Sequence, residues 1–152
     1  MYQVSELRPE NQYELLQMFA RCSAKTRYDR FMTFAADAGR EHVGVLLHDR
    51  ESLSLVLRCG PRVIGVGSLF FCSPGLAEIA LIVEDEFQGR GAGRVLASSL
   101  CKRATECGLS RLELTLSVGN TRIIRLFRSI VASVQFTPAD VGVVTGSLQL
   151  AA

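Results

Sequence analysis

The stretch that most constrains this chain runs from Leu76 to Cys107, where an apolar segment leads through a short acidic turn into a glycine-rich turn. Residues 76–83 (Leu-Ala-Glu-Ile-Ala-Leu-Ile-Val) are typical of a strand, and residues 88–93 (Gln-Gly-Arg-Gly-Ala-Gly) open a predicted helix. The first amides of a helix have no partner within it, the helix dipole makes them partly positive, and glycine lets an anion approach the backbone. The sequence therefore predicts a phosphate-binding turn, to which Arg90 and Arg94 add formal charge.

The glycine spacing excludes two better known phosphate sites. A Rossmann fingerprint needs a glycine where Arg94 stands, and a P-loop needs a Gly-Lys-Ser/Thr ending that this turn does not have. A turn that merely packs a helix close to a strand is the remaining structural alternative.

Composition indicates one soluble domain over residues 1–152, large enough for a single core. Apolar residues make up 48% and charged residues 21%, and the net charge of +2 argues against a nucleic-acid or polybasic membrane surface. The mixed polar segment from Met1 to Glu14 does not resemble a signal peptide, and the longest apolar run is too short to span a membrane. We therefore expect a cytoplasmic protein.

The cysteines and histidines do not suggest a metal site. The 5 cysteines include no Cys-x-x-Cys pair, and the 2 histidines, His42 and His48, have no cysteine near them. We expect no metal and no disulfide framework, but reduced and mostly buried thiols, with Cys101 and Cys107 in the core.

Hydrophobic periodicity predicts a mixed α/β chain. Strands are expected at residues 2–7, 52–59, 63–71, 76–83, 111–118, 133–136 and 142–150, and helices at 9–21, 23–31, 91–107 and after Asn120, with one or two helical turns at 41–47. The first helix is expected to bury an apolar stripe containing Tyr13, Leu16 and Ala20, together with Leu15 and Phe19. Gly65 and Gly67 are expected to mark a bulge or a close backbone approach.

Tight turns make the three central strands an antiparallel meander. The crossover helix at 91–107 then allows residues 111–118 to pair parallel to residues 76–83 in a right-handed β-α-β unit. Such a parallel pair tends to separate where a ligand inserts, at the helix N-terminus.

Residues 88–93 resemble the Gln/Arg-x-x-Gly-x-Gly/Ala signature of the GNAT superfamily of acyl-CoA-dependent N-acetyltransferases. The order of elements is similar to that fold across nearly the whole chain. The resemblance implies a mixed, mostly antiparallel sheet of about six to seven strands with about four helices and a splayed parallel pair. It also implies acetyl-CoA as cosubstrate.

A second segment, Ser23-Ala24-Lys25-Thr26-Arg27-Tyr28-Asp29-Arg30-Phe31, resembles the Ser-x-x-(Ser/Thr)-x-Tyr-x-Arg-Phe segment of the GNAT domains in bacterial protein lysine acetyltransferases. The alternative interpretation is an ordinary amphipathic helix with Tyr28 and Phe31 toward the core.

Glu78 is the predicted general base. It is the only ionisable residue between Leu76 and Val83, and an acid in an apolar strand must be hydrated, paired or raised in pKa. A raised pKa suits a group that takes a proton from an ammonium ion. In the resembling enzymes a glutamate in an Ala-Glu-(Val/Ile)-Ala stretch has this role, and residues 77–80 match that stretch. A salt-bridged or edge-exposed glutamate is the alternative.

The resemblance also implies a cofactor site. Ile82 and Val83 would pair with the pantetheine arm, and the amide of Ile82 or of Val83 would stabilise the oxyanion. The amides of Gln88, Gly89, Gly91 and Gly93 would hold the pyrophosphate, and Arg90, Ala92, Arg94 and Asn120 would complete the site. The amine would attack the thioester directly, without an acylated cysteine.

Two features depart from the family pattern. Many members carry a tyrosine where this chain has Phe127, and the usual Gly-Phe after that helix is replaced by residues 133–136. A thiol is acidic enough to leave as the anion, so losing the tyrosine should slow turnover at most.

Several functional alternatives stay open. The leading hypothesis is acetyl transfer to a primary amine, perhaps a protein lysine; the others are a small-molecule transferase for a polyamine, aminoglycoside or amino acid, and a catalytically silent acyl-CoA-binding module. A cationic substrate would favour an acidic acceptor mouth, for which Glu78, Glu84, Asp85 and Glu86 are available. The oligomeric state, a homodimer included, is also open.

Overall fold

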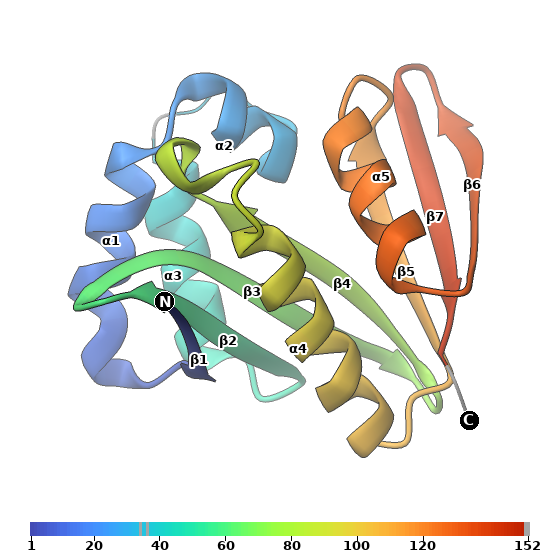
Figure 1. The fold of residues 1–152 in the computed structure, drawn as a ribbon, viewed down its shortest axis with the longest axis horizontal. Coiled ribbons are helices and arrows are strands. Elements are labelled where there is room, and N and C mark those ends of the chain that lie inside the picture. Colours follow the sequence, from blue (N-terminus) through green and yellow to red (C-terminus); the bar gives the residue numbers. More distant parts are fainter. Residues whose placement is uncertain (34, 36, 151–152) are drawn as a thin grey trace.

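A computed structural model describes residues 1–33, 35 and 37–150 as a seven-stranded sheet with helices on both faces (Figure 1). The spatial strand order is β1-β2-β3-β4-β5-β7-β6. The strands are β1 (Tyr2–Glu6), β2 (Ser52–Cys59), β3 (Arg62–Ser73), β4 (Leu76–Val83), β5 (Arg111–Ser117), β6 (Ser133–Asp140) and β7 (Val143–Gln149). The helices are α1 (Gln12–Arg21), α2 (Ala24–Phe31), α3 (Ala38–His48), α4 (Ala92–Glu106) and α5 (Thr121–Ile130), with short 3₁₀ turns at Pro9–Asn11 and Asp85–Phe87.

The sheet is antiparallel except between β4 and β5, which confirms the predicted mixed architecture. Those two strands pair in parallel only at Leu76–Arg111, Ala77–Leu112 and Glu78–Glu113. Beyond Glu78 they separate, and Figure 1 shows the sheet dividing into two parts at this point. The predicted splayed pair is therefore present.

Two apolar clusters cover the sheet. One joins α4 and α5 to strands on both sides of the splay, and Leu96, Leu100 and Phe127 are fully buried in it. The other joins α1 and α3 to the opposite face of β2, β3 and β4. Successive residues of β4 face opposite sides, so Val83 belongs to the first cluster and Ile82 to the second.

The predicted close approach at the β3 glycines is confirmed. A Cβ on Gly67 would lie 2.5 Å from Leu100 Cδ1, so the absence of a side chain lets α4 pack onto the sheet. A Cβ on Gly65 would lie 2.8 Å from the carbonyl oxygen of Ile82.

Three local expectations were wrong. In the first helix Tyr13 is 69% exposed while Met18 is buried, because only the side facing α3 and β3 is covered. Residues 137–140 are not a turn but continue β6, where Pro138 is tolerated because an edge strand has one unpaired side. Cys107 is exposed at the end of α4 and Cys101 is only partly buried, so these are not core thiols.

Within the described residues, no helix is both long and apolar enough to cross a membrane.

Candidate active site

A cavity of about 950 Å³ occupies the gap between β4 and β5 and continues on both faces of the sheet. Its lining includes α2 and Glu78 as well as the glycine turn and α5. The separated strands form its walls, through residues 78–83 of β4 and Leu114, Thr115 and Leu116 of β5. The cavity therefore connects the predicted base to the predicted phosphate-binding turn.

The glycine turn has the geometry that an anion site needs. Gly89 and Gly91 have φ of 74° and 86°, which glycine adopts without strain. The first main-chain bond of α4 runs from Val95 N–H to the Gly91 carbonyl at 3.1 Å, so the amides of Ala92, Gly93 and Arg94 precede the hydrogen-bond ladder. A Cβ on Gly93 would contact only Leu126 Cδ2, at 3.6 Å, which leaves open space in front of these amides. This arrangement fits a diphosphate.

Most predicted site residues line this cavity. They are Glu78, Ile82, Val83, Gln88, Gly89, Gly91, Gly93, Arg94 and Asn120. The two that do not line it are Arg90, whose side chain is solvent-exposed and whose carbonyl accepts a bond from the Tyr2 hydroxyl, and Ala92, which is fully buried in the core.

The structure corrects the expectation for Gln88. Its amide donates to the Asp85 carbonyl at 3.1 Å and is therefore engaged within the chain. Its side chain links three elements: Nε2 donates to Thr26 Oγ1 at 3.0 Å and to the Val83 carbonyl at 2.8 Å, while Oε1 accepts from Arg122 Nη1 at 2.8 Å. Gln88 thus connects α2, the end of β4 and the first turn of α5 in the wall of the cavity.

Strand geometry separates the roles of Ile82 and Val83. The amide of Glu84 donates to the Ile64 carbonyl of β3, and backbone amides alternate in direction along a strand. The amide of Val83 therefore points to the opposite edge, toward the gap, whereas that of Ile82 points to β3. By the same alternation Leu81 offers its amide to the gap, a residue that the sequence analysis missed.

Glu78 lines the cavity, and its side chain is exposed rather than buried. The part of the lining around Glu78, where the sequence predicts the acceptor amine, is called the acceptor end. The prediction of an apolar environment for Glu78 was wrong, because β4 and β5 separate just beyond this residue and α2 covers the strand incompletely. The carboxylate can therefore be hydrated, and it faces Arg30 of α2 across the cavity lining.

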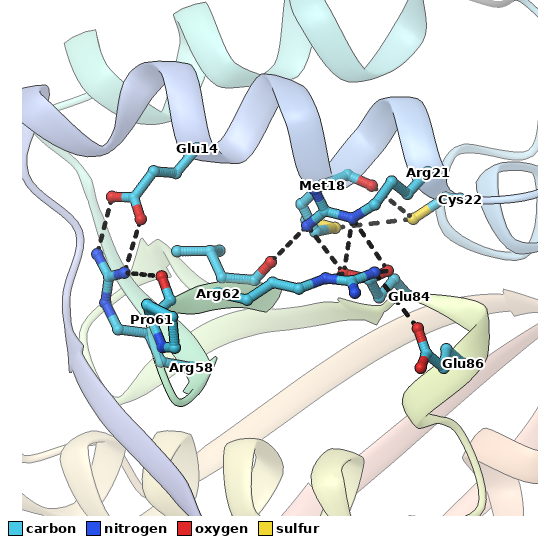
Figure 2. A network of polar contacts seen from close by, with 10 residues as sticks. Glu14, Met18, Arg21, Cys22, Arg58, Pro61, Arg62, Glu84 and Glu86 are labelled. Atoms are coloured by element: carbon cyan, nitrogen blue, oxygen red, sulfur yellow. Dashed lines mark hydrogen bonds and ion pairs between the residues drawn. The ribbon is translucent and has the colours of Figure 1, made fainter.

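The acidic turn does not form the expected acidic mouth, because only Asp85 of its three acids is in the described lining of the cavity. Glu84 is only 2% exposed, and its carboxylate accepts bonds from Arg21 and Arg62, as Figure 2 shows. Asp85 turns toward α2, where it accepts bonds from the Ser23 amide at 2.8 Å, the Ser23 hydroxyl at 2.6 Å and the Thr26 hydroxyl at 3.0 Å. Burial alone would raise the pKa of Asp85, but these hydrogen bonds outweigh it and the pKa lies below its usual value.

These hydrogen bonds give a structural reason for Ser23 and Thr26, the two hydroxyl positions of the second motif. Ser23 also caps α2, since its Oγ accepts from the Thr26 amide at 3.1 Å. The Ser-x-x-Thr spacing therefore docks α2 onto the turn that precedes the glycine loop. No local pattern reveals this pairing, because the partners are about sixty residues apart.

Asn120 lines the cavity and caps α5, where its Oδ1 accepts from the Ile123 amide at 3.4 Å. Phe127 is fully buried and does not line the cavity, whose described lining contains no tyrosine. Among the described residues, no group of three or more His, Cys, Asp or Glu side chains is placed to hold a metal ion.

Comparison with known families shows which family this chain belongs to. The Acetyltransferase (GNAT) family profile matches residues 11–130. The chain belongs to the GNAT acetyltransferase family. It is thus an acetyltransferase by family.

Solved structures show the same GNAT fold. The chain is similar to the GNAT domain of S. lividans PAT, with a TM-score of 0.87, 20% identity and coverage of 98% of this chain and 90% of that one. It is also similar to yncA, a putative acetyltransferase from Salmonella typhimurium solved with acetyl-CoA (TM-score 0.77, 17% identity, 99% and 94% coverage). A third neighbour is the Vibrio cholerae spermidine N-acetyltransferase solved with CoA and spermine (TM-score 0.75, 16% identity, 98% and 95% coverage). A search of curated protein sequences finds no match.

Proposed function

We propose that this GNAT protein transfers the acetyl group of acetyl-CoA to a primary amine, with a protein lysine as the first acceptor to test and Glu78 as the general base. The observation that carries this proposal is the cavity, which joins the glycine turn of α4 to Glu78 through the gap between β4 and β5. The similarity to a PAT domain supports a protein acceptor. We further propose that residues 1–152 act as one domain in the cytoplasm.

In this proposal the cofactor site is formed by the residues that line the gap. The free amides of Gly89, Gly91 and Gly93 and the side chain of Arg94 hold the diphosphate, while Ile82, Val83 and Asn120 flank the pantetheine arm. The side chains of Arg90 and Ala92, which lie off the lining, act only through the shape of the turn, whereas the Ala92 amide precedes the hydrogen-bond ladder of α4 and joins the amides that face the diphosphate.

The chemistry assigned to the protein is proton removal and charge stabilisation. An amine protonated up to about pH 10 in water is not a nucleophile, so Glu78 takes its proton directly or through a water. When bound, acetyl-CoA supplies the thioester carbonyl that the neutral amine attacks. In this proposal the Val83 amide, which points toward the gap, stabilises the negative charge that develops on that oxygen.

The polyamine and aminoglycoside alternatives lose support from the acidic turn. Glu84 is neutralised by two arginines and Asp85 is engaged by α2, so neither is free to bind a polycation.

Thiol release from acetyl-CoA with lysine peptides and small amines tests the proposal. Glu78→Gln should lower kcat/KM at least about tenfold while leaving CoA affinity unchanged, since a lost general base costs roughly 10² or more. Glu113→Gln is the matched control, because Glu113 pairs beside Glu78 on β5 but does not line the cavity; it should stay within about twofold. An equally active Glu78→Gln protein would remove Glu78 as the base, and CoA binding without thiol release from any amine would favour the silent module.

A further inference from the structure

Arg30 is a motif residue of α2 that has no role in the acetyl-transfer scheme. Its side chain is partly buried, yet it lines the acceptor end of the cavity together with Glu78. Burying a guanidinium is costly unless its donors are satisfied. The groups around the Arg30 guanidinium therefore indicate which kind of ligand it binds.

The protein satisfies only part of Arg30. Its Nη2 lies 3.1 Å from His42 Nε2, and its guanidinium lies 5.0 Å from the centroid of the Phe31 ring. Burial lowers the pKa of His42 to about 3, with a contribution from the charge of Arg30, so this histidine is neutral and accepts the bond. No carboxylate in the described chain forms an ion pair with Arg30. Most of its five donors therefore have no partner within the described chain.

Arg30 nevertheless stays charged. Burial lowers its pKa to about 10, and the nearby Glu78 carboxylate opposes that shift. Of the other charged groups near α2, Lys25 Nζ pairs with Asp29 Oδ2 at 3.0 Å, and the Asp85 carboxylate is engaged by Ser23 and Thr26. Arg30 and Glu78 are thus the cation and the anion of the acceptor end that have no ion-pair partner in the described chain.

We propose, on the basis of the acetyl-transfer function above, that Arg30 determines specificity by binding a carboxylate carried beside the acceptor amine. An acceptor with an ammonium and a carboxylate matches the pair in charge, because Glu78 meets the ammonium and Arg30 the carboxylate. A planar guanidinium is suited to bidentate bonds with a carboxylate. The carboxylate comes either from a free amino acid or from an acidic residue next to a lysine in a peptide.

The test compares matched acceptors in the same thiol-release assay. Free amino acids are paired with the amines left when their carboxylate is removed, such as L-lysine with cadaverine, and lysine peptides carry either Glu or Gln beside the lysine. The native protein should prefer the carboxylate member of at least one kind of pair by roughly 10- to 100-fold in kcat/KM, as expected for charge-assisted bonds. The pair that shows the preference identifies the source.

Arg30→Gln should reduce that preference to about twofold or less, and Arg30→Lys should retain part of it. The preference is a ratio measured within one variant, so partial loss of folded protein does not change it. The control is Arg40→Gln, which removes the same charge from an exposed position of α3 away from the cavity and should keep the preference. Acetylation of both members at equal rates, or an unchanged preference in Arg30→Gln, would overturn this inference alone. Absence of thiol release with every amine would overturn the proposed function, and this inference with it.

Discussion

At the scale of single residues, Gly93 is a position where a side chain would be compatible with folding but would obstruct the bound ligand. The helix itself would accept a side chain there, because a Cβ would meet only Leu126 Cδ2 at an ordinary contact distance of 3.6 Å. Its absence is explained by what must approach the free amides of α4 from the cavity.

Gly93→Ala should therefore keep or raise stability, by up to about 1 kcal/mol from the helix propensity of alanine, while CoA affinity falls at least about tenfold. Urea denaturation and calorimetric titration with CoA measure the two effects. Gly44→Ala in α3 is the matched control, since its Cβ would meet nothing within 4 Å; it should show the same gain in stability with CoA affinity unchanged. Unaltered CoA affinity in Gly93→Ala would contradict the assignment of the glycine turn.

At the scale of elements, Glu84 joins the C-terminal end of β4 to α1 and β3. Arg21 of α1 donates to the carboxylate through Nε at 3.1 Å and Nη2 at 2.9 Å, and the same Nη2 reaches the Val63 carbonyl at 2.9 Å (Figure 2). Arg62, the first residue of β3, also donates to the Glu84 carboxylate. Because the glycine turn begins four residues later, this ion triad holds one end of the cofactor site in place.

Glu84→Gln should destabilise the protein by about 2 kcal/mol, because charge-assisted bonds to a buried carboxylate are replaced by weaker ones. Chemical denaturation at pH 7 measures the loss. Glu86→Gln serves as the comparison: Glu86 has a side chain 58% exposed and lies 3.4 Å from Arg62, so its removal should cost within about 0.5 kcal/mol. Similar losses in the two variants would show that burial of Glu84 is not what gives its ion pairs their strength.

At the scale of the whole molecule, the cavity divides the sheet into two parts that are paired directly at only three positions of β4 and β5. A ligand in the gap would touch β4, β5, α4 and α5 together. Ligand binding and global stability should therefore be coupled.

CoA at a free concentration of about 100 times its Kd should stabilise the fold by about 2.7 kcal/mol. Hydrogen exchange should show new protection at the amides of Leu81 and Val83 and at Gly89 to Gly93, whereas Ile82, whose amide faces β3, should change little. Acetyl-pantetheine, which has no nucleotide, is the control ligand and should protect β4 but not the glycine turn. Protection at another part of the sheet would contradict the site.

Much of the fold and part of the site follow from the sequence, because their signals are local. Alternation in residues 76–83 and 111–118, the glycine spacing of 88–93 and the crossover helix between them were sufficient to predict the parallel pair and its opening. Backbone geometry needs only neighbouring residues to be specified, so these predictions were confirmed by the fold. The roles assigned to Glu78 and to the cofactor residues stay predictions.

Only the tertiary structure decided where the charged side chains point. Glu84, Asp85 and Glu86 are adjacent in sequence, yet the first is buried between arginines, the second accepts hydrogen bonds from Ser23 and Thr26, and the third is exposed. Likewise Arg30 and Glu78 share a cavity although 48 positions separate them in the chain. The physical reason is that a charge is stabilised by whichever partners the packed chain brings within a few ångströms, and no local pattern encodes those partners.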